Sequence, residues 1–76
     1  MRRVGEVVRT AQGLAVLRVP DGEDPADIGT MVLDDSLTTV GRVVDVFGPV
    51  THPYVAVTPK DSTALAELLG QSLYAR

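Results

Sequence analysis

The segment that decides the fold is GRVVDVFGPVTHPYVAVTP, residues 41–59. It contains two runs rich in Val, which favours strands because its branched side chain packs well on a pleated sheet. Between the runs stand Gly48-Pro49 and His52-Pro53. Proline fixes its own φ and restricts the residue before it. The segment therefore predicts two strands joined by a stiff turn.

Both faces of the first strand in this segment are partly apolar. Alternate residues of a strand share a face, so Val43, Asp45 and Phe47 lie on one side. Val44 and Val46 then lie on the other side. If Val43 points into a core, we expect Val44 and Val46 to point outward.

Aromatic residues gather around the turn that joins the two strands. Phe47 is the only Phe of the chain, and Tyr54 is one of its two Tyr. If Val55 and Val57 are core, Tyr54 points outward beside the turn. A rigid turn loses little entropy on docking, and aromatic side chains are frequent interface anchors. The alternative is that Phe47 and Tyr54 plug one end of the fold, and the residues alone leave both interpretations open.

The rest of the chain continues the strand-rich pattern, with thirteen Val against one Ile among 76 residues. Short apolar runs between turn residues predict strands at residues 3–10, 14–19, 28–33, 37–47, 53–58 and 72–75, with a bulge or bend near Gly41. Residues 62–69 switch to a helical spacing of Leu and predict one short helix packed on the sheet. Asp61 or Ser62 is its expected N-cap, and Gly70 its expected end. The pattern predicts an all-β fold, a small six-stranded closed β-barrel with one short C-terminal helix, because closure removes exposed edges.

Charge is unevenly distributed along an acidic chain. Ten Asp and Glu against seven Lys and Arg give a net charge of −3, which argues against a general nucleic-acid binder. Residues 20–29, PDGEDPADIG, predict an exposed acidic loop. Their spacing does not match a calcium loop. A cation site and a patch that faces a basic partner both stay open as alternatives.

Residues that could carry catalysis are not brought together by their spacing. His52 is the only His and stands in a turn, and the adjacent Asp34 and Asp35 would point to opposite faces of a strand. With no Cys, neither disulfides nor thiolate metal sites are expected. We therefore predict no enzymatic activity, no metal and no cofactor. No apolar run approaches the ~20 residues of a membrane helix, and a cytoplasmic location is expected.

A close resemblance to the archaeal Gar-one family is carried by GRVVDVFGPV at residues 41–50 and PYVAVTP at residues 53–59. Members of this family are the small protein subunits of box H/ACA ribonucleoproteins. The closing LGQSLY, residues 69–74, is also similar to the C-terminal signature of the family. The resemblance is most specific from Val40 onward, whereas the first 39 residues agree only in strand pattern.

The resemblance implies a six-stranded barrel of the translation-factor type, like domain 2 of elongation factor Tu. It implies one Gar-type domain over residues 1–76, without Gly/Arg-rich tails, in the cytoplasm of an archaeal-type cell. Such a subunit binds the catalytic domain of the pseudouridine synthase subunit, the archaeal counterpart of dyskerin. Through a mobile substrate-gripping loop of the synthase it influences substrate loading and product release in RNA-guided pseudouridylation of rRNA. Guide RNA and rRNA are then reached indirectly, through the complex.

On this resemblance, eight residues around the turn are predicted to bind the synthase: Val44, Val46, Phe47, Gly48, Pro49, Val50, Pro53 and Tyr54. Weak self-association of the isolated domain through an unused apolar patch stays open. The alternative function is a free-standing RNA-binding barrel that acts directly on rRNA or tRNA. That function needs a basic stripe with stacking aromatics.

Overall fold

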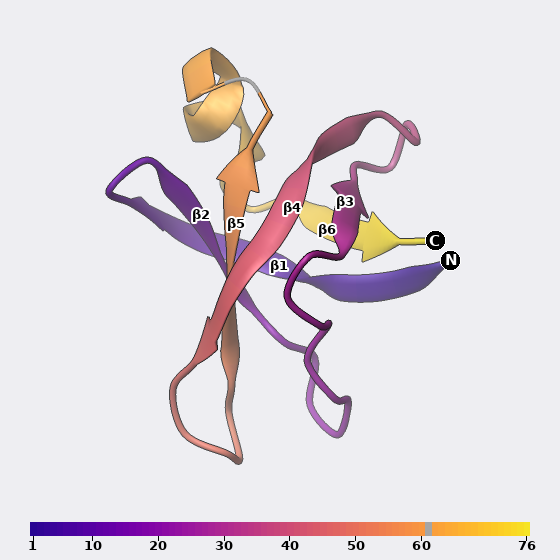
Figure 1. Ribbon diagram of the computed structural model, residues 1–76, viewed down its shortest axis with the longest axis vertical. Coiled ribbons are helices and arrows are strands. Elements are labelled where there is room, and N and C mark those ends of the chain that lie inside the picture. The colour runs from indigo at the N-terminus through magenta and orange to yellow at the C-terminus, as the bar shows by residue number, and fades with distance from the viewer. Residues whose placement is uncertain (61) are drawn as a thin grey trace.

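The computed structural model is a closed barrel of six antiparallel strands, which confirms the fold predicted from the sequence (Figure 1). The structure describes residues 1–60 and 62–76, without the side chains of residues 62–64. The strands run in the order β1-β2-β5-β4-β3-β6 around the barrel, and a 3-10 helix, η1, precedes the last strand. Their bounds are β1 (Arg2–Ala11), β2 (Leu14–Arg18), β3 (Met31–Leu33), β4 (Thr39–Phe47), β5 (Tyr54–Pro59), η1 (Ser62–Leu68) and β6 (Ser72–Ala75).

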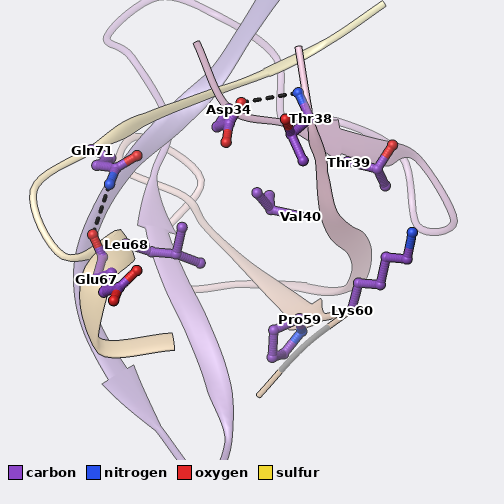
Figure 2. A pocket seen from close by; sticks show the side chains of 9 residues that line it. All are labelled: Asp34, Thr38, Thr39, Val40, Pro59, Lys60, Glu67, Leu68 and Gln71. Atoms are coloured by element: carbon purple, nitrogen blue, oxygen red, sulfur yellow. Dashed lines mark hydrogen bonds between the residues drawn. The ribbon is translucent and has the colours of Figure 1, made fainter. Parts of the chain in front are cut away.

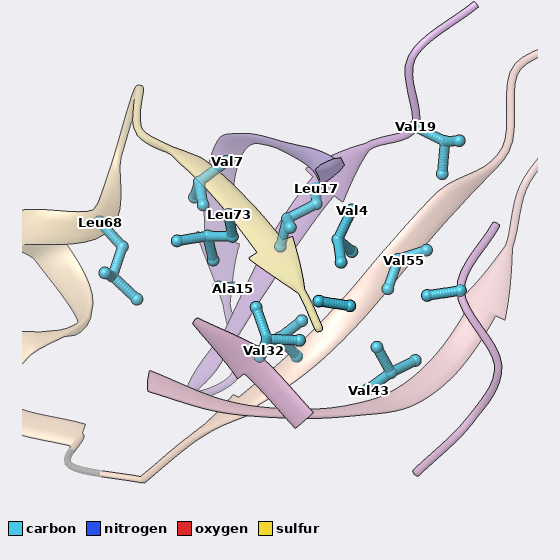
Figure 3. Close-up of a cluster of buried hydrophobic side chains, with 13 residues drawn as sticks. Val4, Val7, Ala15, Leu17, Val19, Val32, Val43, Val55, Leu68 and Leu73 are labelled. Carbon is cyan, nitrogen blue, oxygen red and sulfur yellow. The ribbon is translucent and has the colours of Figure 1, made fainter. Parts of the chain in front are cut away.

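Apolar side chains from all six strands fill the barrel (Figure 3). Among the residues whose burial is described, no polar or charged residue is buried. Full burial of a Val or Leu side chain contributes about 1.5–3 kcal/mol, so the stability of this small domain depends on these contacts. The largest fully buried side chains are Val7, Leu17, Val32, Val43, Val55, Val57 and Leu73.

The predicted hairpin of β1 and β2 is confirmed, with a two-residue turn between Ala11 and Leu14. Gln12 and Gly13 both have positive φ, at 53° and 77°. Two positive values in succession define the turn that matches the right-handed twist of paired strands. The local sequence therefore sets the register in which β1 pairs with β2.

A shift of register in β4 overturns one prediction about its faces. Val43 pairs with Val57, but Asp45 pairs with Ala56, so Val44 is an extra residue in a bulge. A bulge reverses the alternation of the residues that follow it. Val44 does point outward, as predicted, and is 36% exposed.

The outward position predicted for Val46 is wrong, because this residue follows the bulge. Val46 pairs with Val55, a fully buried core residue. The Val46 side chain is half-buried and packs against the core cluster. A second shift of register lies at Val40, where β4 pairs with β3, and confirms the bulge or bend predicted near Gly41.

The strand predicted from residue 28 begins only at Met31. Gly29 has a φ of 95°, and the Thr30 amide donates to the Asp27 carbonyl at 3.1 Å, so a turn occupies these residues. Ile28 is left 66% exposed in the loop. The third strand is therefore only three residues long.

The helix predicted over residues 62–69 is a 3-10 helix that ends at Leu68. Residues three apart align in a 3-10 helix, so Leu65 and Leu68 both face the core. Leu69 falls off this face and is 51% exposed, contrary to a packed α-helical stripe. Gly70 ends the helix as predicted, with a φ of 81° and its amide donating to the Val7 carbonyl at 2.9 Å. The predicted N-cap, Asp61 or the Ser62 side chain, lies outside what the structure describes.

Replacing Leu37 with Asn is expected to raise the free energy of unfolding by about 0.5–1 kcal/mol. The fourth strand was predicted to begin at Leu37, but this residue lies in the β3–β4 turn with a φ of 66° and is 52% exposed. The left-handed conformation costs an ordinary residue roughly 1–2 kcal/mol, and Asn adopts it more readily. Urea unfolding would measure the change. Leu37→Ala is the matched control, because it removes the same side chain without relieving the backbone, and an equal gain in both variants would contradict the explanation.

Candidate functional site

The connection between β4 and β5 projects from the end of the barrel opposite η1 (Figure 1). A turn forms where the His52 amide donates to the Pro49 carbonyl at 3.1 Å. Val50 stands in this turn with 98% of its surface exposed. An aliphatic side chain in that position contributes nothing to the core. Only a second molecule could remove it from water.

Phe47 and Tyr54 face one another across the last registered pair of β4 and β5. Their rings stack, with centroids 5.8 Å apart and planes inclined by 23°. Val55, next to Tyr54, is in the core, so Tyr54 points outward as predicted. Both rings are half-buried and neither belongs to the core cluster, which favours the docking interpretation over the alternative that they plug the barrel.

Gly48 allows the turn to close against the aromatic pair. Its φ is 92°, a value that side chains rarely adopt. A Cβ on this residue would lie 2.9 Å from Cδ2 of Tyr54 and 3.5 Å from the carbonyl oxygen of His52. The glycine in this position therefore keeps the Tyr54 ring packed against the backbone of the turn.

A groove of about 320 Å³ runs between this turn and the acidic loop. Six of the eight predicted residues line it: Val46, Phe47, Gly48, Pro49, Val50 and Pro53. Tyr54 does not line the groove but stacks on Phe47, which does. Val44 lies outside the groove, in the bulge of β4. The predicted residues thus come together around one surface feature, with Val44 as the exception.

The opposite wall of the groove consists of Glu23, Asp24 and Pro25, which the sequence did not associate with the turn. The β2–β3 loop is held there by the buried side chains of Val19 and Ala26. The Val19 amide also donates to the Pro53 carbonyl at 3.3 Å. The site therefore has an apolar wall from one loop and an acidic wall from another.

A second contact between the two loops is weak. Nδ1 of His52 lies 3.9 Å from Oδ1 of Asp21, and both side chains are mostly exposed. Exposed pairs of this kind contribute about 0–1 kcal/mol because water screens them. The buried anchors Val19 and Ala26, rather than this pair, hold the acidic loop beside the turn.

The opposite end of the barrel has a hollow of about 250 Å³ between the β3–β4 turn and η1 (Figure 2). Val40, Pro59 and Leu68 contribute apolar surface to it. The Asp34 carboxylate accepts bonds from the amides of Ser36 and Thr38 at 2.9 and 3.0 Å, so it serves the local turn. Within residues 1–60 and 62–76, no three His, Asp or Glu side chains gather as a metal site would require.

A small antiparallel barrel that presents a stiff, exposed apolar turn is typical of a binding module. No helix in the described part of the chain is long and apolar enough to cross a membrane. The family model described as the Gar1/Naf1 RNA binding region matches residues 1–76. The chain therefore belongs to the Gar1 family, whose role is RNA-binding and associated with ribonucleoprotein complexes. No curated protein matches the chain.

Proposed function

We propose that this chain is a non-catalytic protein subunit of a box H/ACA ribonucleoprotein. In this proposal it binds the dyskerin-like pseudouridine synthase subunit and promotes RNA-guided pseudouridylation of rRNA. Membership of the Gar1 family supports the assembly. The observation that carries the contact is the stiff turn, which holds Val50 98% exposed on the apolar wall of the groove.

The turn is suited to docking because little has to be ordered when it binds. Pro49 and Pro53 restrict its backbone, and the stack of Phe47 on Tyr54 supports it from the barrel. Immobilising a free side chain on binding costs about 0.5–1.5 kcal/mol, which a preformed surface largely avoids. The proposed partner surface is a hydrophobic hollow that accepts Val50.

The acidic wall of the groove suggests the charge of that partner surface. Glu23 and Asp24 are exposed beside the apolar turn. Charges at the rim of an interface steer association more than they add to affinity. We therefore expect Lys or Arg on the synthase beside its apolar contact, and faster association at low salt.

In this role the subunit supplies no acid, base or nucleophile to the reaction. It acts by binding beside the substrate-gripping loop of the synthase and biasing that loop between its conformations. Such a bias changes substrate loading and product release without touching the chemical step. The expected kinetic result is a higher turnover rate of the assembled particle and an unchanged rate in a single turnover with preloaded RNA.

Replacing Val50 with Asp is expected to weaken synthase binding about tenfold or more. The substitution places a charge in an apolar contact, and a tenfold loss corresponds to about 1.4 kcal/mol of binding free energy. Because Val50 is 98% exposed, the unfolding midpoint should stay unchanged. Isothermal titration of the purified synthase with each variant would measure the loss.

Leu69→Asp is the matched control for this experiment. Leu69 is 51% exposed at the opposite end of the barrel, and its replacement makes the same change of charge. The control should bind the synthase like the unmodified chain. Equal affinity of the Val50 variant and the control would contradict docking through the turn, and tight binding of guide RNA without any synthase binding would favour the free-standing RNA-binding barrel.

A further inference from the structure

A row of paired residues without a carboxylate crosses four neighbouring strands, and one of them, Leu33, is buried at 3% exposure. Arg3 on β1 pairs with Tyr74 on β6, and Tyr74 pairs with Leu33 on β3. Leu33 in turn pairs with Thr39 on β4. Leu73 and Ala75 face the core, so Tyr74 between them points outward and is half-buried.

A second row beside the first carries Met31, Arg42 and Thr58, which pair in succession across β3, β4 and β5. Met31 is 53% exposed, and Arg42 is also exposed. Strand pairing, rather than proximity in sequence, places this arginine beside the methionine.

Two adjacent hollows connect these rows with further basic residues. Met31, Arg42, Thr58 and Lys60 line a hollow of about 260 Å³, and Thr39 contributes to it. Met31 and Thr39 also line the next hollow, of about 380 Å³, together with Arg76. We call Arg42, Lys60 and Arg76, with Met31 between them, the basic face.

The carboxylates of the described residues lie outside the two hollows of the basic face, although Lys60 also lines the hollow of Figure 2 with Asp34 and Glu67. Among the described residues, no Asp or Glu lines either of its two hollows. Figure 2 shows the Lys60 side chain extending toward Thr39, away from Glu67 on the other side of the barrel end. The acidic residues Glu23 and Asp24 instead line the groove beside the β4–β5 turn. A chain with a net charge of −3 thus keeps three of its seven basic residues around one exposed apolar side chain.

We infer that the basic face binds single-stranded RNA through its phosphate backbone. Guanidinium groups such as Arg42 and Arg76 bind phosphate oxygens in a bidentate manner, and the hydroxyls of Thr39 and Thr58 are further donors. Two adjacent hollows that share Met31 and Thr39 offer a longer surface than a single small anion needs, which suits a polymer. Neither hollow is lined by an aromatic ring of the described residues, so the phosphate contacts carry the binding, and Met31 adds an exposed apolar surface beside them.

This inference goes beyond the synthase contact and does not depend on it. The family model is described as an RNA binding region but assigns that role to no face of the barrel. The Val50 turn and the basic face share no residue, so RNA and synthase could occupy the chain together. In the assembled particle the basic face would contact RNA directly, rather than only through other subunits.

The test uses the 76-residue chain and a fluorescein-labelled single-stranded oligouridylate of about 10 nucleotides, a length within the range that small barrels bind. Fluorescence anisotropy at several salt concentrations gives the affinity and its salt dependence. For the double variant Arg42→Gln/Arg76→Gln we expect at least roughly fivefold weaker binding at low salt. The slope of log K against log salt should fall by about 1.4, because each lost phosphate contact of a single strand contributes about 0.7.

The matched control is Arg9→Gln/Arg18→Gln, which removes the same charge from exposed residues of β1 and β2 outside the basic face. This variant should keep the affinity within about twofold and the slope within about 0.3, since only long-range attraction is lost. Equal losses in the two double variants, or none in either, would overturn the inference. So would displacement of the label by an equal length of polyglutamate, which would identify an acidic protein as the ligand. Titration of the synthase with Arg42→Gln/Arg76→Gln separates the two proposals, because synthase binding should be unchanged.

Discussion

Replacing Gly41 with Ala is expected to lower the free energy of unfolding by about 3–4 kcal/mol, at the upper end of what single substitutions do. An added Cβ would lie 2.0 Å from the carbonyl oxygen of Thr58 and 3.1 Å from Cα of Pro59. Both neighbours are backbone atoms, so no side chain can rotate away. To accommodate the methyl group, β4 and β5 would have to separate where they pair. Denaturant unfolding followed by circular dichroism would measure the loss.

Gly22→Ala is the control for this prediction. Gly22 has a φ of 79° but nothing within 4 Å of an added Cβ, so only the left-handed conformation is penalised. The expected loss is about 1–2 kcal/mol. A domain of this size has a total stability of roughly 4–11 kcal/mol, at about 0.05–0.15 kcal/mol per residue. Comparable losses at the two positions would mean that the close approach of β5 to Gly41 does not exist in solution.

Replacing Val46 with Asp is expected to cost about 2–3 kcal/mol, whereas Val44→Asp should change stability by no more than about 0.5 kcal/mol. Val46 packs against the core cluster beside Val55, and an Asp there would lose that packing and desolvate its carboxylate. Val44 stands in the bulge and faces outward. The two variants make the same chemical change two residues apart, so urea unfolding of the pair tests the position of the bulge.

The opposite order, with Val44→Asp the more damaging, would place Val44 in the core and refute the bulge. The pair also matters for the binding experiments. A charge at Val46 would weaken synthase binding by disturbing the barrel, even if Val46 never touches the partner. Val50 is the sharper probe, because its exposure separates the effect on binding from the effect on folding.

Most of the fold could be predicted because the local signals agree with one another. The turn at Gln12 and Gly13, the stop at Gly70 and the density of Val each favour the structure that the chain adopts. The wrong predictions occur where a bulge or a turn interrupts the regular alternation of a strand. A bulge at Val44 inverts the face of Val46, and the positive φ of Gly29 delays β3. Neither device has a sequence signature as strong as the alternation that it breaks.

One wall of the candidate docking site could be predicted from the sequence, and the other could not. Phe47, Gly48, Pro49 and Val50 adjoin one another in the chain, so a single turn brings them together. The acidic wall of the groove could not be predicted, because it depends on where the β2–β3 loop returns to the barrel. That return is decided by the burial of Val19 and Ala26 beneath the loop.

The sequence by itself determined the strand-rich class, the stiff apolar turn and the resemblance to a family, since these depend on neighbouring residues. Only the tertiary structure decided that Val46 faces inward and that Arg42 and Arg76 share a face with Met31. The physical reason is that a closed barrel pairs strands that are distant in the chain. The register of those pairs follows from packing across the whole core, which no local segment encodes.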